Sequence, residues 1–157
     1  MRSMSTHAFS LLELMIVTAI LGVISIGAPA IYQWIRYQGV SHAADQLRCD
    51  LQLARLMAIS RKQPCKLEFN SPGTGQYRNS LSHQVVDLRI YRGGVRFLPQ
   101  GPDGNSMSSQ ISFNSRGMAV PAGDIYLSNE DHTRIFRLLV LMPGSISIFR
   151  WERGQWR

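Results

Sequence analysis

The chain has 157 residues, 45% of them hydrophobic, which leaves room for one folded domain and not for several. The formal net charge is +7, and 15 of the 17 basic residues are arginine. They are scattered with no run of five or more, which indicates a solvated surface. Arginine suits phosphate and carboxylate partners, so a polyanionic partner and a coding bias towards arginine both stay open as explanations.

The N-terminal part combines a polar start with an apolar segment. Residues 1–8 are short, polar and slightly basic, whereas the 22 residues from Leu14 to Ile35 carry no charge. A helix of that length measures roughly 33 Å, enough to cross a hydrocarbon core of roughly 30 Å. Glu13 stands at the start of this segment, where a carboxylate costs up to about 2.5–3.5 kcal/mol in a membrane. We therefore expect a cationic partner for Glu13.

The residues around Glu13 resemble a known processing signal. The segment from Ala8 to Met15, Ala-Phe-Ser-Leu-Leu-Glu-Leu-Met, resembles the class III signal of type IV pilins and type II secretion pseudopilins. The resemblance implies that prepilin peptidase cuts between Ala8 and Phe9 and N-methylates Phe9, which makes Glu13 the fifth mature residue. The family usually has glycine before the cut, so Ala8 is a departure.

Cleavage would create the missing partner of Glu13. A free α-amino group has a pKa of about 7.7–8.0, and methylation keeps the nitrogen cationic. Phe9 and Glu13 are four residues apart and share a helix face. The amine can then meet its own carboxylate or that of an adjacent subunit, and the pairing sets the register of assembly.

Two other interpretations of the N-terminus stay open. Ala28-Pro29-Ala30 matches the cleavage site of an ordinary signal peptide, which would leave Ile31 as the first residue. A plain single-pass anchor is the second alternative. Glu13 fits poorly in the apolar core of a signal peptide.

The first helix is expected to continue to about Lys62, since residues 31–62 contain one glycine and no proline. Pro29 predicts a bend or local melting near Gly27–Pro29. Two apolar stripes follow at helical spacing, which predicts partners on both sides: the chain's own domain and neighbouring subunits, or burial within one fold. The stripes are Leu47, Leu51, Ala54 and Ala58, and Cys49, Leu53 and Leu56.

After Pro64 the pattern changes to strands. Cys65 to Phe69 alternate between apolar and charged residues and run into a turn-rich segment, residues 70–75, which predicts a hairpin. Arg134 to Leu141 is nearly continuously apolar, which predicts a central strand covered on both faces. The sequence thus predicts an α+β fold in which a long N-terminal helix packs on an antiparallel sheet. The other expected strands are Val85–Tyr91, Val95–Leu98, Gln110–Phe113, Ile125–Leu127 and Ser145–Trp151.

This arrangement is similar to the GspH/FimT branch of the type IV pilin-like superfamily. The clearest matching segments are residues 53–61 and 111–117. The resemblance implies four regions: a leader peptide (1–8), a transmembrane and assembly helix (9–35), its periplasmic continuation (36–63) and a globular sheet domain (64–157). It also implies a single-pass protein of the bacterial inner membrane, with its N-terminus in the cytoplasm and its C-terminal domain in the periplasm.

The cysteines and histidines offer no reactive site. A helix that runs to about Lys62 holds Cys49 roughly 20 Å from its end, too far for a disulfide with Cys65. We expect two free thiols, with Cys65 buried. His7, His42, His83 and His132 are scattered without ligand spacing, so neither a catalytic metal nor a cofactor is expected. Residues 101–106 could offer calcium ligands, although a plain turn fits their composition better.

The C-terminus combines basic and aromatic residues. This mixture is used to bind nucleic acid, and some FimT-type pilins are implicated in DNA uptake through a Gly-Arg-x-Arg motif that the matching turn here, residues 143–147, lacks. Contact with another pilin is therefore favoured over DNA, and a simple amphipathic strand is the remaining alternative. The residues concerned are Arg150, Trp151, Arg153, Trp156 and Arg157.

The sequence as a whole predicts a non-enzymatic minor pilin or pseudopilin. Its partners would be prepilin peptidase, the inner membrane and other pilin or pseudopilin subunits of one filament. The N-terminal motif is shared by type II secretion systems and type IV pili, so both machines stay open. DNA binding in natural transformation is the alternative function.

Overall fold

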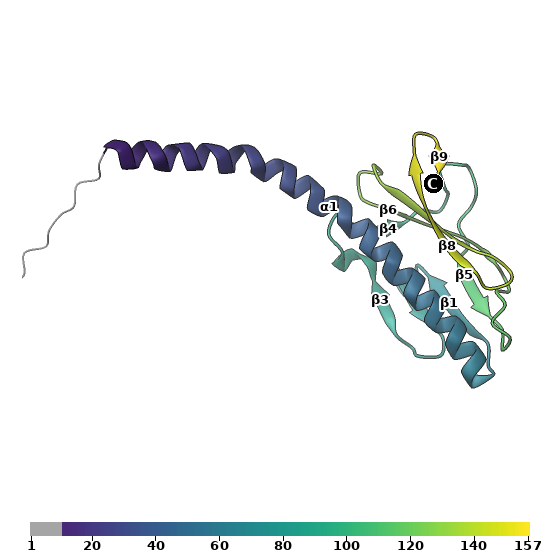
Figure 1. Cartoon of the computed structure of the whole chain (residues 1–157). Helices are drawn as coiled ribbons and strands as arrows, with labels where there is room; N and C mark the ends of the chain where they lie inside the picture. The colour runs from purple at the N-terminus through teal and green to yellow at the C-terminus, as the bar shows by residue number, and fades with distance from the viewer. Residues whose placement is uncertain (1–10) are drawn as a thin grey trace, which may run out of the picture. The chain divides into compact units, whose positions relative to one another are not determined.

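The structure, a computed structural model, describes residues 11–157 and the side chains of all of these except residues 26–37. The chain divides into two compact units, of which the first ends at Trp34 and the second comprises Ile35–Arg157. One helix, α1 (Leu11–Arg61), contributes to both units (Figure 1).

In the first unit the described residues are entirely helical. The apolar side chains of residues 11–25 are exposed, from 45% at Val17 to 77% at Leu11. The hydroxyl groups of Thr18 and Ser25 donate to the carbonyl oxygens of Leu14 and Leu21, so these polar side chains are satisfied within the helix. Hydropathy identifies no membrane-spanning helix among the described residues.

The helix assignment is continuous across Pro29. The backbone is therefore not locally melted at Gly27–Pro29, which was one of the two expectations for this place. The bend at Pro29 stays a prediction.

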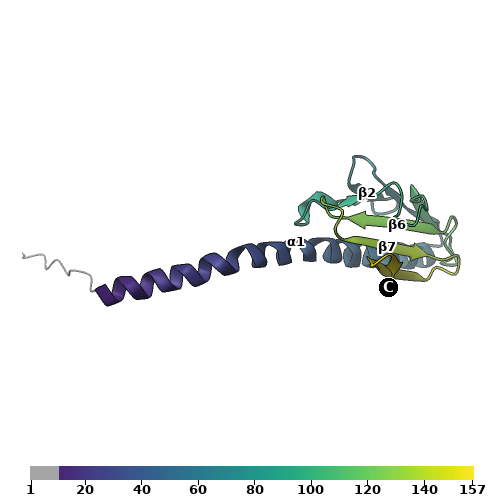
Figure 2. The same cartoon turned by 90° about the horizontal axis from the view of Figure 1, so that it is seen from above.

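In the second unit α1 packs on strands that form two antiparallel sheets. The four-stranded sheet has the order β3-β2-β1-β5, and the five-stranded sheet has the order β4-β6-β7-β8-β9. Figure 2 shows β6 and β7 as neighbouring strands along the helix. The strands are β1 (Cys65–Phe69), β2 (Gln76–Asn79), β3 (Val85–Asp87), β4 (Arg96–Phe97), β5 (Gln110–Phe113), β6 (Gly123–Ser128), β7 (Ile135–Val140), β8 (Ile146–Glu152) and β9 (Gln155–Trp156).

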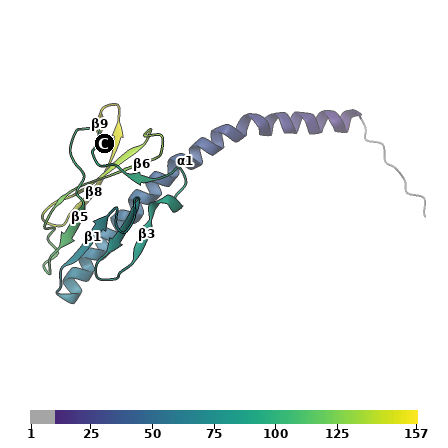
Figure 3. The same ribbon diagram turned by 180° about the vertical axis from the view of Figure 1, so that it is seen from behind.

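One hydrophobic core joins α1 to both sheets, whose strands lie beside the C-terminal half of α1 in Figure 3. The predicted first stripe on α1 is fully buried in it, at Leu47, Leu51, Ala54 and Ala58. From the sheets, alternate residues of β1, β5 and β7 face the same core, such as Leu67 from β1. The helix therefore has one face that the chain itself covers, as the stripe predicts.

Polar contacts fix α1 against the strands at two further places. Asp50 accepts a hydrogen bond from the hydroxyl group of Tyr77 on β2. Arg55 donates from Nε to the carbonyl oxygen of Gly117 over 3.0 Å and from Nη2 to that of Pro143 over 3.2 Å. Arg55 thus connects the helix to the loops that follow β5 and β7.

A glycine permits a close backbone contact near the start of the second unit. A Cβ atom at Gly39 would lie 1.8 Å from the carbonyl oxygen of Arg92, so no other residue fits without movement of the backbone. The helix ends at Arg61, where Lys62 takes a left-handed φ of 52° before Pro64. The predicted end of the helix at about Lys62 is confirmed.

Several predicted strands differ in detail from the observed ones. Of the expected strand Val85–Tyr91 only Val85–Asp87 pairs as a strand, because the Asp87 side chain accepts from the Arg89 backbone N–H and starts the 3₁₀ turn η1 (Leu88–Ile90). The sheet is also divided in two, and β9 was not expected.

Strand β2 was not predicted either, although its hairpin with β1 was. Its apolar content is the single residue Tyr77, so it shows no period-two pattern of hydrophobic residues. Its inward polar residue, Asn79, is 8% exposed and accepts from the backbone N–H groups of Leu81 and Ser82. A strand stabilised by such side-chain contacts gives no hydrophobic signal in the sequence.

Strand β7 is central in its sheet, as expected for residues 134–141. Only one of its faces is buried, however, since its residues alternate between buried and half-buried. The expectation of two covered faces was therefore wrong, and the reason is Arg137, which stands on the second face with carboxylate partners.

Candidate interaction site at the C-terminal hairpin

Strands β8 and β9 form a tight hairpin that brings the predicted arginine and tryptophan residues together. Glu152 pairs with Gln155, so the connection has two residues, Arg153 and Gly154. Both have positive φ angles, 49° and 81°, which match the right-handed twist of hairpin strands. The hairpin is drawn in yellow in Figure 1.

Trp156 is the anchor of this hairpin. Its ring centroid lies 4.9 Å from that of Trp151 across the strand pair and 5.8 Å from that of Tyr126 on β6. The guanidinium carbon of Arg137 lies 5.7 Å from the Trp156 ring centroid, within the range of a cation–π contact. The indole N–H donates to Oδ2 of Asp103 over 3.0 Å. Trp156 is therefore held by contacts of its ring with Trp151, Tyr126 and Arg137 and by the hydrogen bond from its indole N–H.

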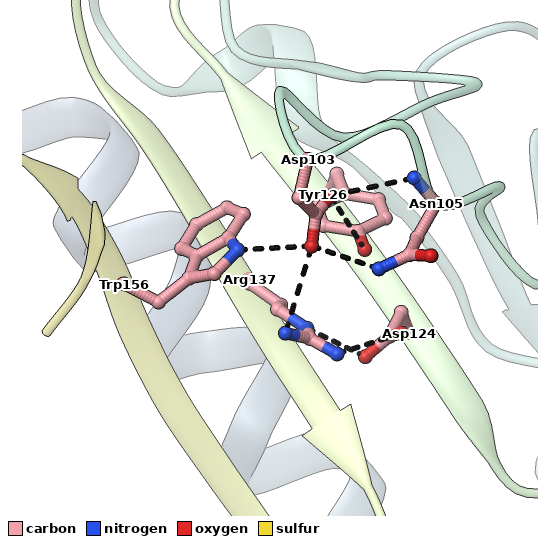
Figure 4. Close-up of polar contacts among 6 residues, drawn as sticks. All are labelled: Asp103, Asn105, Asp124, Tyr126, Arg137 and Trp156. Carbon is pink, nitrogen blue, oxygen red and sulfur yellow. Dashed lines mark hydrogen bonds and ion pairs between the residues drawn. The ribbon is translucent and has the colours of Figure 1, made fainter. Parts of the chain in front are cut away.

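Asp103 is the centre of a polar cluster beside Trp156 (Figure 4). It accepts from the Asn105 side chain over 2.9 Å and lies 3.7 Å from Arg137. Arg137 in turn forms two bonds with Asp124, of 2.7 Å and 3.0 Å. The cluster links the loop 101–106 to β6, β7 and β9.

The cluster combines two carboxylates, Asp103 and Asp124, with one guanidinium group, that of Arg137. Burial raises the pKa of Asp103, but hydrogen bonds from Trp156 and Asn105 outweigh it and leave the pKa below its usual value. The hydrogen bond to Asp124 raises the pKa of Arg137. Burial and the nearby Asp124 carboxylate raise the pKa of Tyr126 to about 12. Asp103 is thus ionised and the Tyr126 phenol neutral at neutral pH.

This arrangement leaves Asp103 unsuited to the calcium site considered for residues 101–106. Its carboxylate faces N–H donors and a guanidinium group, which occupy the positions that a cation would need. Among residues 11–157 no group of three or more His, Cys, Asp or Glu side chains is placed to hold a metal. The loop serves as a turn that packs on Tyr126, because a Cβ atom at Gly101 would lie 2.5 Å from that ring.

A second feature of the hairpin is the basic hollow. It is open, has a volume of about 450 Å³ and is lined mainly by arginine. Arg150 pairs with Glu152 in its wall, and the backbones of Arg150 and Arg157 exchange hydrogen bonds of 2.6 Å and 2.9 Å. The lining residues are Thr133, Arg134, Arg150, Trp151, Glu152, Arg153 and Arg157.

The structure thus divides the five predicted C-terminal residues into two groups. Four of them line the basic hollow, whereas Trp156 belongs to the Asp103 cluster. Arg134 and Arg137 were not predicted as site residues. A signal for Arg137 did exist, because it is a single charge inside the apolar segment 134–141.

The predicted second stripe on α1 is exposed. Cys49 is exposed, Leu53 is 48% exposed and Leu56 is 62% exposed. Within the described chain nothing covers this face, so burial within one fold was the wrong alternative for it. Cys49 and Cys65 are both free, and Cys65 is buried, as predicted.

The predicted N-terminal site is only partly within the described residues. Ala8 and Phe9 lie outside them, and Glu13 lies in the first turn of α1 with its side chain exposed. The processing site and the pairing of Phe9 with Glu13 therefore stay predictions.

Comparisons with known proteins agree on one family. The family model named type II transport protein GspH matches residues 43–144. The family model for the prokaryotic N-terminal methylation motif matches residues 3–29. A comparison with curated protein sequences gave no match.

A solved structure confirms the fold. The type IV minor pilin FimU of Pseudomonas aeruginosa is similar at 15% identity with a TM-score of 0.52, over 75% of this chain and 92% of that one. A second crystal form of the same protein gives 14% identity and a TM-score of 0.48 over 74% and 96%. The α+β architecture is that of a type IV pilin-like protein. The chain belongs to the GspH family.

Proposed function

We propose that this chain is a minor pilin or pseudopilin, a structural subunit of a filament in a type II secretion system or a type IV pilus. The observation that carries the proposal is the occurrence of two family signals in one chain, the methylation motif at residues 3–29 and the GspH region at residues 43–144. The helix-and-sheet fold supports it. The chemistry of the hairpin cluster also fits a structural role, since its charged groups bond to one another.

We propose that residues 1–8 are a leader that prepilin peptidase removes between Ala8 and Phe9. Phe9 would then be the methylated N-terminus, and Glu13 would pair with its cationic nitrogen or with that of a neighbouring subunit. The position of Glu13 in the first turn of α1, followed by exposed apolar side chains, supports this assignment. A buried carboxylate is tolerated when a cationic partner is present.

The remaining regions follow from the same proposal. Residues 9–35 would anchor the subunit in the bacterial inner membrane and later pack in the filament, and residues 36–63 and 64–157 would lie in the periplasm. The exposed stripe of Cys49, Leu53 and Leu56 on α1 supports contact with a neighbouring subunit, because the chain leaves it uncovered.

DNA binding is a second candidate function, favoured by the four arginines and Trp151 of the basic hollow. Two features weaken it: Trp156 is held by Asp103 and cannot stack freely on bases, and the turn at residues 143–147 contains no arginine. Phosphate contacts give affinity that falls steeply with salt. Absence of binding to single- or double-stranded DNA even at low salt would remove this candidate.

Shearing of filaments tests the main proposal. Cells that assemble the secretion or pilus filament are sheared, and the chain is detected in the purified filament fraction. We expect it there, in substoichiometric amounts, only when prepilin peptidase is active. A single-span inner-membrane protein of similar size serves as the control for membrane contamination. If filaments assemble and the chain stays wholly in the membrane fraction, the proposal is wrong.

A further inference from the structure

Strand β8 has one edge that is not paired over most of its length. The backbone N–H and C=O of Arg150 both bond to Arg157, away from β7. Since successive residues of a strand point their backbone groups to alternate sides, those of Ile146 and Ile148 point the same way as those of Arg150. The Leu141 N–H donates to the Ser145 carbonyl, which therefore points towards β7. The groups of the next residue, Ile146, then point away from β7, in agreement with this register.

Strand β9 covers only the far end of that edge. Its partners on β8 are Trp151 and Glu152, with the added Arg150–Arg157 exchange. Within residues 11–157 no hydrogen bond reaches the outward backbone groups of Ile146 and Ile148. All residues of β8 are half-buried, so none of them is fully covered by the rest of the described chain.

The other sheet edges are short or covered. Strand β4 has two residues and β3 has three. Beside β5 the segment 118–120 closes the edge, since Phe113 pairs with Ala119 and the Val120 N–H donates to the Ser112 carbonyl. Proteins usually protect longer edges with charges, proline or bulges. The segment from Ile146 to Phe149 has neither a charge nor a proline.

The basic hollow adjoins the end of this open edge. Four arginines and one glutamate line it, and the glutamate is already paired with Arg150. An added strand in line with β9 would therefore begin beside an excess of positive charge. Carboxylate side chains at that end of the strand are complementary to it.

A second copy of this chain fits the edge poorly. The chain carries a net charge of +7, so two copies repel each other wherever they meet. Like charges across an interface oppose association.

We propose that the open edge of β8 binds an extended, acidic segment of another filament subunit by strand addition. The backbone groups of Ile146 and Ile148 would supply the hydrogen bonds, and Arg153 and Arg157 would receive the carboxylates. The identity of the partner as a filament subunit rests on the proposed function. The ability of the edge to bind an acidic strand is independent of that function.

Amide hydrogen exchange of the full-length chain in detergent tests this capacity. The probe is the peptide Thr-Glu-Val-Glu-Val-Glu-Thr, and the matched control replaces its glutamates with lysine. The acidic peptide should slow exchange at Ile146 and Ile148 by about tenfold or more at saturation, while Ser147 and Phe149, already bonded to β7, change little. Equal effects of the two peptides, or no protection at Ile146 and Ile148, would overturn the proposal.

Two variants of one residue separate the backbone from the side chain. Ile148→Pro removes the outward N–H and is tolerated where that group faces solvent, whereas Ile148→Ala removes the side-chain contacts and keeps the N–H. We expect the peptide to bind to Ile148→Ala and not to Ile148→Pro, with circular dichroism confirming that both are folded. Equal binding to both would count against strand addition. Loss of folding in Ile148→Pro would leave the exchange result on the native chain to decide.

The charge and the alternative ligand are tested in the same assay. Arg153→Asn keeps a residue that tolerates the left-handed φ at this position and should weaken peptide binding several-fold. A single-stranded DNA oligonucleotide that binds the hollow when the acidic peptide does not would overturn the proposal in favour of nucleic acid.

Incorporation into filaments distinguishes a failure of this inference from a failure of the proposed function. A wild-type chain that is found in filaments but does not bind the peptide would contradict only the strand addition. A chain that binds the peptide but is absent from assembled filaments would contradict the proposed function.

Discussion

The indole N–H of Trp156 donates to the carboxylate of Asp103 over 3.0 Å, across 53 residues of sequence. This bond fixes β9 to the loop 101–106. It also places the Trp156 ring against Tyr126 and Arg137, so that the last strand is held by side chains as well as by its short ladder with β8. The shape of the C-terminal hairpin therefore depends on a carboxylate far away in the sequence.

The substitution Asp103→Ala should destabilise the globular unit by about 1–3 kcal/mol, because it leaves the Trp156 N–H without its acceptor and removes one of the two carboxylates beside Arg137. Urea unfolding followed by tryptophan fluorescence measures the effect. Asp45→Ala is the control, since Asp45 is exposed on α1, and should change the free energy of unfolding by less than about 0.5 kcal/mol. Equal effects of the two substitutions would show that the Asp103 bond adds nothing.

The same carboxylate predicts a pH dependence. Because the pKa of Asp103 is lowered in the folded chain, its contribution to stability is fully present above the unfolded value of about 3.9 and is lost as the pH falls towards the folded value. The difference in unfolding free energy between the native chain and Asp103→Asn should therefore shrink below about pH 4. Unfolding curves at pH 7, 5 and 3 provide the measurement. A difference that grows on acidification would contradict the assigned direction.

Replacement by alanine should lower stability strongly at one leucine of α1 and hardly at another. Leu51 is fully buried, and Leu51→Ala should cost about 2–5 kcal/mol through the cavity it leaves. Leu56 is 62% exposed, and Leu56→Ala should change stability by less than about 0.5 kcal/mol. Thermal or urea unfolding compares them, and the filament fraction is then assayed. Normal incorporation of Leu56→Ala would argue against a neighbouring subunit on the exposed stripe.

The fold was predictable where a local period exists. The buried positions of the structure match two patterns in the sequence. One is the helix stripe from Leu47 to Ala58, and the other is the alternation of Cys65, Leu67 and Phe69 on β1. Both patterns report directly which side of an element faces the core.

The site was less predictable because its contacts are long-range. The sequence gathers Arg150, Trp151, Arg153, Trp156 and Arg157 in eight residues, but the side on which each lies depends on the two-residue turn and on the acceptor at Asp103. The sequence pattern contains no information on that pairing. Strand β2 was missed for a similar reason, since its contacts with Asp50 and Cys65 lie outside the strand.

Glu13→Ala should leave the chain in the membrane fraction but impair its incorporation into filaments, because it removes the carboxylate that we propose pairs with the cationic N-terminus at Phe9. Quantification of the chain in sheared filaments measures this. Thr18→Ala is the control, since the Thr18 hydroxyl bonds only within its own helix. Normal incorporation of Glu13→Ala would show that the pairing does not guide assembly.

The most direct test of the whole account is mass spectrometry of the N-terminus of the chain purified from cells with active prepilin peptidase. Processing as a pilin predicts a chain that begins with N-methylated Phe9. A chain that begins at Ile31 would indicate an ordinary signal peptide, and one that keeps residues 1–8 would indicate a plain membrane anchor. Either result would contradict assignment as a processed filament subunit.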